Sequence, residues 1–226
     1  MFVERRNGGP RERLIASAGE LFAERGFRAT TARDIAQRAG VNLAAANYYF
    51  GSKKELYLEV LRANFAQISA MLARRGGSRP AAEIDRLGRP AIVQMLVRRI
   101  QVMLEILIGP PPGQHGALMQ REMIDPSEAL PLIVDEFIGP MTLETERIVA
   151  RLAPGLEPRH VERCALSIIG QAVFYRFAMP ALLLQKRLKS YPRGFGPDLA
   201  QHIAEFSLGG MERVAARKAR RARALA

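Results

Sequence analysis

The chain has 226 residues, of which 48% are hydrophobic and 25% are charged; this composition excludes a disordered polymer and indicates a soluble globular protein. The formal net charge is +12, yet residues 80–211 are neutral, with 14 Lys and Arg against 14 Asp and Glu. Residues 1–79 hold 14 basic against 7 acidic residues, and residues 212–226 hold 6 against 1. We therefore expect an anionic partner for the two ends and a different role for the middle.

The single cysteine, Cys164, cannot form an internal disulfide, and the start MFVERRNGGP lacks the apolar run of a signal peptide, so the sequence predicts a cytoplasmic protein. The segment 164–184 is long enough to span a membrane, but it contains Arg176 and Pro180. We interpret it as a helix buried in a bundle or a dimer interface, and we expect no membrane partner.

The first helix is predicted over residues 11–25, because apolar side chains recur there at helical spacing and Gly26 follows as a stop signal. Thr31 and Asp34 have the spacing of a capping box, which predicts a second helix that starts at Thr31 and stops at Gly40. Asn42 is the next candidate N-cap. Ser52 is the one after it, ahead of a long helix over residues 53–74.

Two short helices that meet at a glycine turn indicate a helix-turn-helix, whose second helix enters the major groove of DNA. With Ala46 and Phe50 on the buried face, helical spacing places Ala44, Ala45, Asn47 and Tyr48 on the other face. The alanines would let the backbone approach the bases, Asn47 can pair with adenine, and the hydroxyls of Tyr48 and Tyr49 can reach phosphates, with Lys53 adding a charge contact. Alternatively, the alanines only favour a helix, Asn47 is solvated and the tyrosines pack on neighbouring helices.

The run GFRATTARDIAQRAGVNLAAANYYFGSKKELYLEVL, residues 26–61, resembles the DNA-binding domain of the TetR family of bacterial transcriptional regulators. The resemblance implies DNA contacts at Thr31, Arg33, Leu43, Ala44, Ala45, Tyr48, Tyr49 and Lys53. Asn42 and Asn47 complete the predicted DNA-binding set. Asn47 stands where the family usually has a tyrosine that meets the DNA backbone, so readout of a base and contact with a phosphate both stay open.

The remainder of the chain also reads as helical. Helices are predicted over 90–108, from about 126 with interruptions at Pro131 and Pro140, over 158–186 with a bend near Pro180, and from about 197 into the basic tail. The segment REMIDPSEALPLIVDEFIGPM, residues 121–141, is similar to the C-terminal domain of the CecR-like branch of the family.

The internal prolines suggest either helices bent around a cavity or short helices joined by loops, since a proline inside a helix costs about 3 kcal/mol. The family resemblance implies a small apolar ligand in such a cavity. The candidate wall residues, which are otherwise plain core, are Met103, Leu107, Phe137, Met141, Phe174 and Phe177.

No enzymatic or metal chemistry is expected, and no cofactor. His115, His160 and His202 are too far apart in sequence for ligand spacing, a glycine-rich phosphate loop is missing, and Cys164 lies in an apolar helical context.

We therefore predict an all-α protein with an N-terminal three-helix, helix-turn-helix DNA-binding domain, residues 1–60, and a C-terminal helical-bundle domain for ligand binding and dimerisation, residues 61–226. A homodimer is expected because one short recognition helix reads only a few base pairs. The predicted function is a repressor released from a palindromic operator on double-stranded DNA by a small apolar ligand; the alternatives are an activator or a non-inducible, sequence-tolerant DNA-binding protein. The candidate dimer contacts are Ile168, Ile169, Val173, Ile203 and Phe206.

Overall fold

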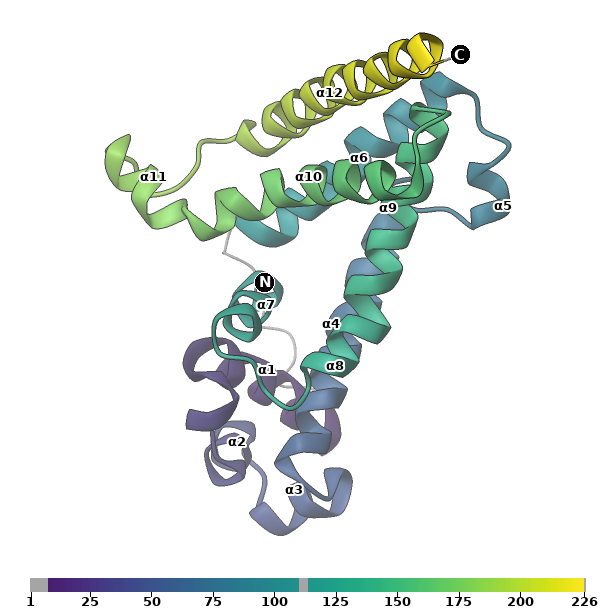
Figure 1. Cartoon of the computed structure of the whole chain (residues 1–226). Coiled ribbons are helices and arrows are strands. Elements are labelled where there is room, and N and C mark those ends of the chain that lie inside the picture. Colours follow the sequence, from purple (N-terminus) through teal and green to yellow (C-terminus); the bar gives the residue numbers. More distant parts are fainter. Residues whose placement is uncertain (1–7, 110–113, 226) are drawn as a thin grey trace. The chain divides into compact units, whose positions relative to one another are not determined.

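The structure is a computed structural model that describes the backbone of residues 8–109 and 114–225 (Figure 1). Side chains are described over the same ranges, except at residues 114, 115 and 218–225. All regular secondary structure in these ranges is helical, which confirms the predicted all-α class. The predicted wall and interface residues all lie in the described part, whereas His115 and most of the basic tail lie outside it as side chains.

The N-terminal helices follow the predicted pattern closely. Their bounds are α1 Pro10–Ala29, α2 Ala32–Ala39, α3 Leu43–Phe50 and α4 Lys53–Arg74. Gly26 breaks the helical geometry inside α1 with φ 84° and ψ 168°, and one further helical turn follows it. Glycine adopts this φ without the penalty that a side chain would bring, so the predicted stop is a kink within a longer helix.

The later helices are more fragmented. Their bounds are α5 Ala81–Ile84, α6 Arg89–Ile108, α7 Gln114–Ile124, α8 Leu130–Ile133, a π-helix Val134–Ile138, α9 Gly139–Leu152, α10 Pro158–Phe177, α11 Met179–Gln185 and α12 Phe195–Leu225. The predicted helix start at Pro126 was wrong, because the helix begins at Leu130. The backbone N–H of Ser127 donates instead to Glu122 (3.1 Å), and its hydroxyl accepts from the N–H of Ala129 (3.1 Å), which holds this segment as a turn.

The three prolines predicted to interrupt helices differ in their setting. Pro131 lies at the start of α8, after a turn, whereas Pro140 lies in α9 directly after the π-helix, which continues into α9 without a break. Pro180 lies at the start of α11, where the chain bends by 63° after α10. Pro131 gives up no helical hydrogen bond, because the first N–H groups of a helix have no intrahelical partner. A short helix after a turn therefore accounts for Pro131, the predicted bend near Pro180 is confirmed, and Pro140 follows a π-helical turn inside one continuous helical segment.

The described residues form two compact units. The first contains the residues up to Ile68 together with those from Gln114 to Val134, and the second contains residues 69–109 and 135–225. The chain thus enters the second unit through α4, returns to the first as α7 and α8, and goes back through the π-helix. A single boundary near residue 60 does not account for α7 and α8, which follow that boundary in the sequence but belong to the first unit. The predicted division into two domains at that residue stays a prediction.

The core of the first unit is built around the aromatic ring of Tyr57, which is 1% exposed. Its ring centroid lies 4.7 Å from that of Phe22 in an edge-to-face arrangement and 4.9 Å from that of Phe27. Aliphatic side chains of α1, α2 and α4 complete the core; among them are Leu14, Leu21, Ile35, Leu56 and Leu61. Burial of aromatic and aliphatic area of this kind supplies most of the stabilisation of a small helical domain.

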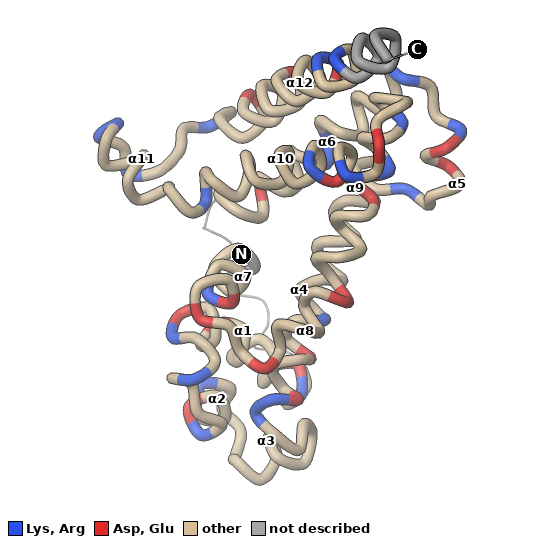
Figure 2. Tube along the Cα trace, viewed as in Figure 1, with Lys and Arg blue, Asp and Glu red and all other residues tan. Residues whose placement is uncertain are grey.

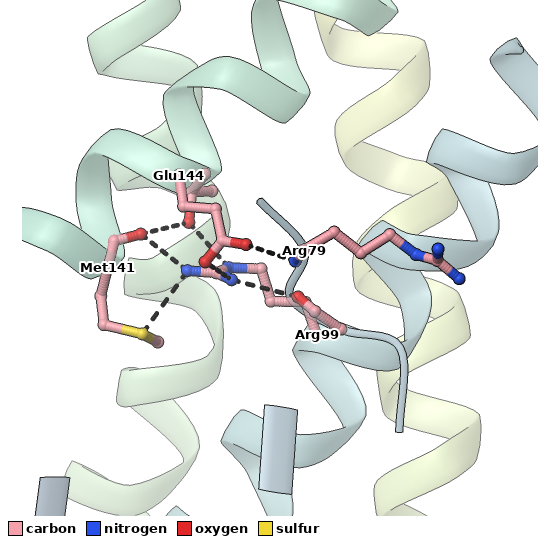
Figure 3. A network of polar contacts seen from close by, with 6 residues as sticks. Arg79, Arg99, Met141 and Glu144 are labelled. Carbon is pink, nitrogen blue, oxygen red and sulfur yellow. Dashed lines mark hydrogen bonds and ion pairs between the residues drawn. The ribbon is translucent and has the colours of Figure 1, made fainter. Parts of the chain in front are cut away.

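The second unit packs α6, α9, α10 and α12 around an apolar core. Arg99 of α6 is only 3% exposed within this unit, and its guanidinium reaches α9 and the loop after α4 (Figure 3). It donates to Thr145 Oγ1 (3.0 Å) and Glu144 (2.7 Å), and to the carbonyls of Gly77 (3.1 Å) and Met141 (2.8 Å). Burial lowers the pKa of Arg99, and the charge of Glu144 opposes that shift. The ion pair between the two side chains links α6 to α9 inside the core.

Within the described residues, no single helix is both long and apolar enough to cross a membrane. Helices α10 and α11 reach that length and composition only when taken together, and they are bent by 63° where they meet.

Candidate DNA-binding interface

The start of α2 is fixed by the predicted capping box. The N–H of Asp34 donates to Thr31 Oγ1 (3.1 Å), and Asp34 Oδ2 accepts from the N–H of Thr31 (3.0 Å). The hydrogen bond with the Thr31 side chain is the main cause that lowers the pKa of Asp34. At the other end Gly40 takes the left-handed conformation, φ 65°, which turns the chain directly toward α3.

Helix α3 is capped at both ends by its own residues. Asn42 Oδ1 accepts from the N–H of Ala45 (2.7 Å), and the N–H of Gly51 donates to the carbonyl of Asn47 (2.8 Å). The side-chain oxygen of Asn42 is therefore engaged in capping the helix, and its side-chain NH2 group is the part that stays available for a DNA contact.

The two faces of α3 differ as the helical spacing predicts. Ala46 and Phe50 are 6% and 7% exposed, whereas Ala44 and Asn47 lie on the exposed face, with Leu43 and Ala45 half-buried between the two. Tyr48 is 85% exposed and meets Tyr49 with a centroid distance of 5.5 Å. This exposure contradicts packing of Tyr48 on a neighbouring helix and leaves its hydroxyl available to an external partner.

Lys53 has a role that the sequence did not indicate. Its Nζ donates to the carbonyls of Phe27 (2.9 Å) and Thr30 (3.0 Å), and it lies 4.2 Å from the centroid of the Phe27 ring. An ammonium group has three N–H donors, so one remains for a phosphate. Lys53 holds the end of α1 against α4, and its predicted phosphate contact is limited to that third donor.

Several other cations near the helix-turn-helix are bound to the protein itself. Arg38 pairs with Glu24 (3.0 Å), Lys54 with Glu128 (2.8 Å) and Arg28 with Asp125 (3.2 Å). Arg33 is exposed and, among the described residues, has no hydrogen bond or ion pair. Helix α3 contains no charged residue at all (Figure 2), so base-edge contacts from α3 itself must come from neutral side chains.

Comparison with known proteins identifies the family. Residues 14–60 match the model described as "Bacterial regulatory proteins, tetR family", and residues 92–211 match "HTH-type transcriptional dual regulator CecR, C-terminal domain". The regulator CecR of Shigella flexneri is 30% identical over 183 residues, which cover 77% of this chain and 79% of that protein. The chain belongs to the TetR family. It is a DNA-binding transcriptional regulator with a C-terminal domain of the CecR type.

More local and more distant matches agree with this family. The repressor KstR2 of Rhodococcus jostii is 48% identical over 54 residues, 24% of this chain and 26% of that protein. The activator FasR of Mycolicibacterium smegmatis is 44% identical over 52 residues, 23% of this chain and 24% of that protein. A crystal structure of a putative transcriptional regulator from Pseudomonas aeruginosa shares the fold, with a TM-score of 0.66 at 20% identity over 96% of this chain and 98% of the other.

In the C-terminal part of this TetR-family chain, two of the predicted ligand-wall residues are placed differently from the prediction. Phe174 and Phe177 are 55% and 64% exposed, so within one chain they do not line an enclosed cavity. They lie on the side of α10 away from its buried residues. The other four candidates are partly buried; they are Met103, Leu107, Phe137 and Met141.

Two predicted dimer contacts were also wrong. Ile168 and Ile203 are each 1% exposed and belong to the core of their own chain, so they cannot reach a partner. Val173 and Phe206 are exposed and Ile169 is half-buried, and their contact with a partner stays a prediction. Leu166, 49% exposed, was missed although it lies two helical turns before Val173 on the same face.

Proposed function

We propose that this regulator is a repressor that binds a palindromic operator as a homodimer and is released by a small apolar ligand. The observation that carries the DNA-reading part is the capped helix α3, with Ala44, Asn47 and Tyr48 exposed and Ala46 and Phe50 buried. A helix held in this way can enter a major groove without rearranging its own packing. DNA of a bacterial operator lies in the cytoplasm, which is where we expect the protein to act.

The proposed dimer forms through α10 and α12. On α10 an exposed apolar stripe runs through Leu166, Val173 and Phe177, and Gly170 lies within it with nothing near the position of an added Cβ. On α12, Phe206 is 68% exposed, and Gly209 and Gly210 likewise have open space beside them. Small residues between large apolar ones permit close approach of helices, and a two-fold axis would bury both stripes on both copies.

The proposed ligand site is in the second unit, with Met103, Leu107, Phe137 and Met141 as its candidate wall. The support is their partial burial and the flexible, apolar character of methionine and leucine. The backbone carbonyl of Met141 is held by Arg99 (2.8 Å). A ligand that shifts this part of α9 would act as an inducer only if it bound one arrangement of the dimer more tightly than the other.

Activation is the second candidate, because CecR is named a dual regulator and FasR an activator. The two candidates differ in where the protein binds relative to a promoter. Footprinting on the DNA upstream of its own gene, followed by transcription in vitro with purified polymerase, decides between them: a repressor lowers transcription from the protected promoter, and an activator raises it.

Sequence-specific binding itself is tested by the ratio of operator to random-DNA affinity at one salt concentration. We expect a ratio of about 10³ or more and protection of an inverted repeat whose half-site centres lie about 34 Å or more apart. A ratio near one would leave only a sequence-tolerant DNA-binding protein, and protection of a single unrepeated site would contradict the dimer.

A further inference from the structure

Helix α7 belongs by sequence to the C-terminal domain, since it lies within the CecR-type match over residues 92–211. In the structure it is part of the DNA-binding unit and packs against α1. The chain reaches α7 from α6 and leaves it through α8 and the π-helix toward α9. Helix α7 therefore lies in the proposed DNA-binding unit, while the chain on both sides of the α7–α8 segment belongs to the proposed ligand-binding unit.

Two adjacent residues of α7 attach it to the DNA-binding helices. Arg121 Nε donates to the carbonyl of Ala23 (2.9 Å), and its Nη2 donates to the carbonyl of Glu24. Glu122, 3% exposed, accepts a hydrogen bond from the hydroxyl of Tyr57 in α4. The side chains of Arg121 and Glu122 thus bind α1 and α4.

The carbonyls that Arg121 binds lie three and two residues before the kink at Gly26. Around this kink the backbone oxygens accept hydrogen bonds from side chains of three separate parts of the chain. Arg121 donates to the carbonyls before the kink, and the hydroxyl of Thr30 donates to the carbonyl of Gly26 itself (2.8 Å). Lys53 donates to the carbonyl of Phe27, just beyond the kink (2.9 Å). An arginine suits this position because its planar fork carries donors that reach two acceptors at once.

The kink leads directly to the start of α2. Thr30 is fully buried, and the next residue, Thr31, is the N-cap of α2 and one of the predicted DNA contacts. Glu24 binds Arg121 through its carbonyl and Arg38 of α2 through its carboxylate (3.0 Å). A change in how Arg121 holds the end of α1 is therefore passed to α2 through two routes that involve no direct contact with DNA.

We propose that Arg121 is a positioning residue for DNA binding: it fixes the kinked end of α1, and through it the first turn of α2, from a helix that continues into the C-terminal unit. The inference rests on the proposed operator binding. The proposed route by which a change in the second unit alters operator affinity runs along the chain into α7, and from Arg121 to the end of α1 and the start of α2. Release of Arg121 from the two carbonyls loosens residues 26–31 and weakens the operator complex without removing any phosphate contact.

The test compares full-length Arg121→Ala and Arg121→Lys with the wild type. Arg147→Ala is the matched control, because Arg147 forms an exposed ion pair with Asp85 (3.3 Å) in the second unit and its loss changes the net charge equally. Operator affinity is measured over a series of salt concentrations, and amide hydrogen exchange is measured over residues 26–31 in the free protein.

Arg121→Ala is expected to weaken operator binding by about three- to tenfold, the equivalent of one to two hydrogen bonds, with an unchanged salt slope and faster exchange over residues 26–31. Arg121→Lys keeps the charge but not the fork, and should show the same faster exchange; Arg147→Ala should match the wild type in both. Arg121→Lys also serves if the alanine variant fails to fold.

Two results would overturn the inference. Wild-type affinity and exchange in Arg121→Ala or Arg121→Lys would mean that the contact positions nothing. A salt slope reduced by about 0.9 in Arg121→Ala but not in Arg147→Ala would mean that Arg121 binds a phosphate itself. Failure of the proposed function is distinguishable, since the wild type would then lack operator preference while the exchange measurement would still report on the contact.

Discussion

The hydroxyl of Tyr57 should carry a measurable part of the stability of the DNA-binding unit. Tyr57 and Glu122 are 1% and 3% exposed, and their hydrogen bond joins α4 to α7. Tyr57→Phe removes one oxygen and keeps the ring contacts with Phe22 and Phe27, so the change reports on the polar contacts of the hydroxyl, of which the bond to Glu122 is the main one. The second carboxylate oxygen of Glu122 retains the N–H of Ser127 (3.1 Å), while the first loses its donor within the protein interior.

We expect Tyr57→Phe to lower the free energy of unfolding by about 1.5–3 kcal/mol, the range for a buried hydrogen bond to a group that can carry charge. Tyr48→Phe is the control, because the Tyr48 side chain is 85% exposed and its hydroxyl can bond to water. The assay is urea unfolding followed by circular dichroism at pH 7. A loss below about 0.5 kcal/mol, equal to that of the control, would refute the assignment of this bond as a stabilising contact.

The same bond predicts the alkaline limit of stability. Burial, reinforced by the bond to Glu122, raises the pKa of the Tyr57 hydroxyl above its ordinary value. A raised pKa means that the contribution is fully present below the unfolded-state value of about 10 and is lost as the pH rises beyond it. Wild-type stability should therefore decline above about pH 10 more steeply than that of Tyr57→Phe, and equal slopes would contradict the assignment.

Three further predictions concern DNA and the dimer. Asn47→Ala should cost about 1–3 kcal/mol on the operator and relax preference at one base pair of each half-site if Asn47 pairs with adenine; uniform weakening across base variants in a binding-site selection would mean that it meets only the backbone. Val173→Asp should raise the dimer dissociation constant in sedimentation equilibrium with little change in monomer helicity, whereas Ile168→Asp should unfold the second unit, because only the former is exposed. Deletion of residues 213–226 tests the basic tail: a lower salt slope of DNA binding would show phosphate contacts, and an unchanged slope with unchanged dimerisation would leave a solvated tail.

The sequence predicted the local features of the first unit well. Thr31, Gly40 and Asn42 cap their helices as expected, and α4 begins and ends at the predicted residues. These features depend on hydrogen bonds between residues within four or five positions of each other, which a local pattern specifies. The exposed face of α3 follows from the same short-range geometry.

Contacts across long sequence separations could not be predicted in this way. Lys53 binds carbonyls 26 and 23 residues away, and Arg121 binds carbonyls 98 and 97 residues away. Nothing in the pattern around either residue distinguishes it from an exposed cation.

The prediction of which side of α10 and α12 is exposed was incomplete for a different reason. Both helices carry apolar side chains on two sides, so helical spacing does not say which side faces the chain's own core. Ile168 and Val173 are equally apolar in sequence, and only the packing against α6 and α12 makes the first buried and the second exposed.

In α3 the residues that hold the helix in place are different from the exposed residues that are proposed to meet DNA, and this separation bears on how the recognised operator sequence could change. The residues that maintain the helix are the caps at Asn42 and Gly51 and the buried Ala46 and Phe50, and the exposed positions contribute nothing to that set. Substitutions at the exposed positions should therefore exchange one recognised sequence for another at little expense in folding. A library randomised at residues 44, 47 and 48 would be expected to stay folded in most of its members, and so to offer natural or laboratory selection a wide choice of half-sites from a single scaffold.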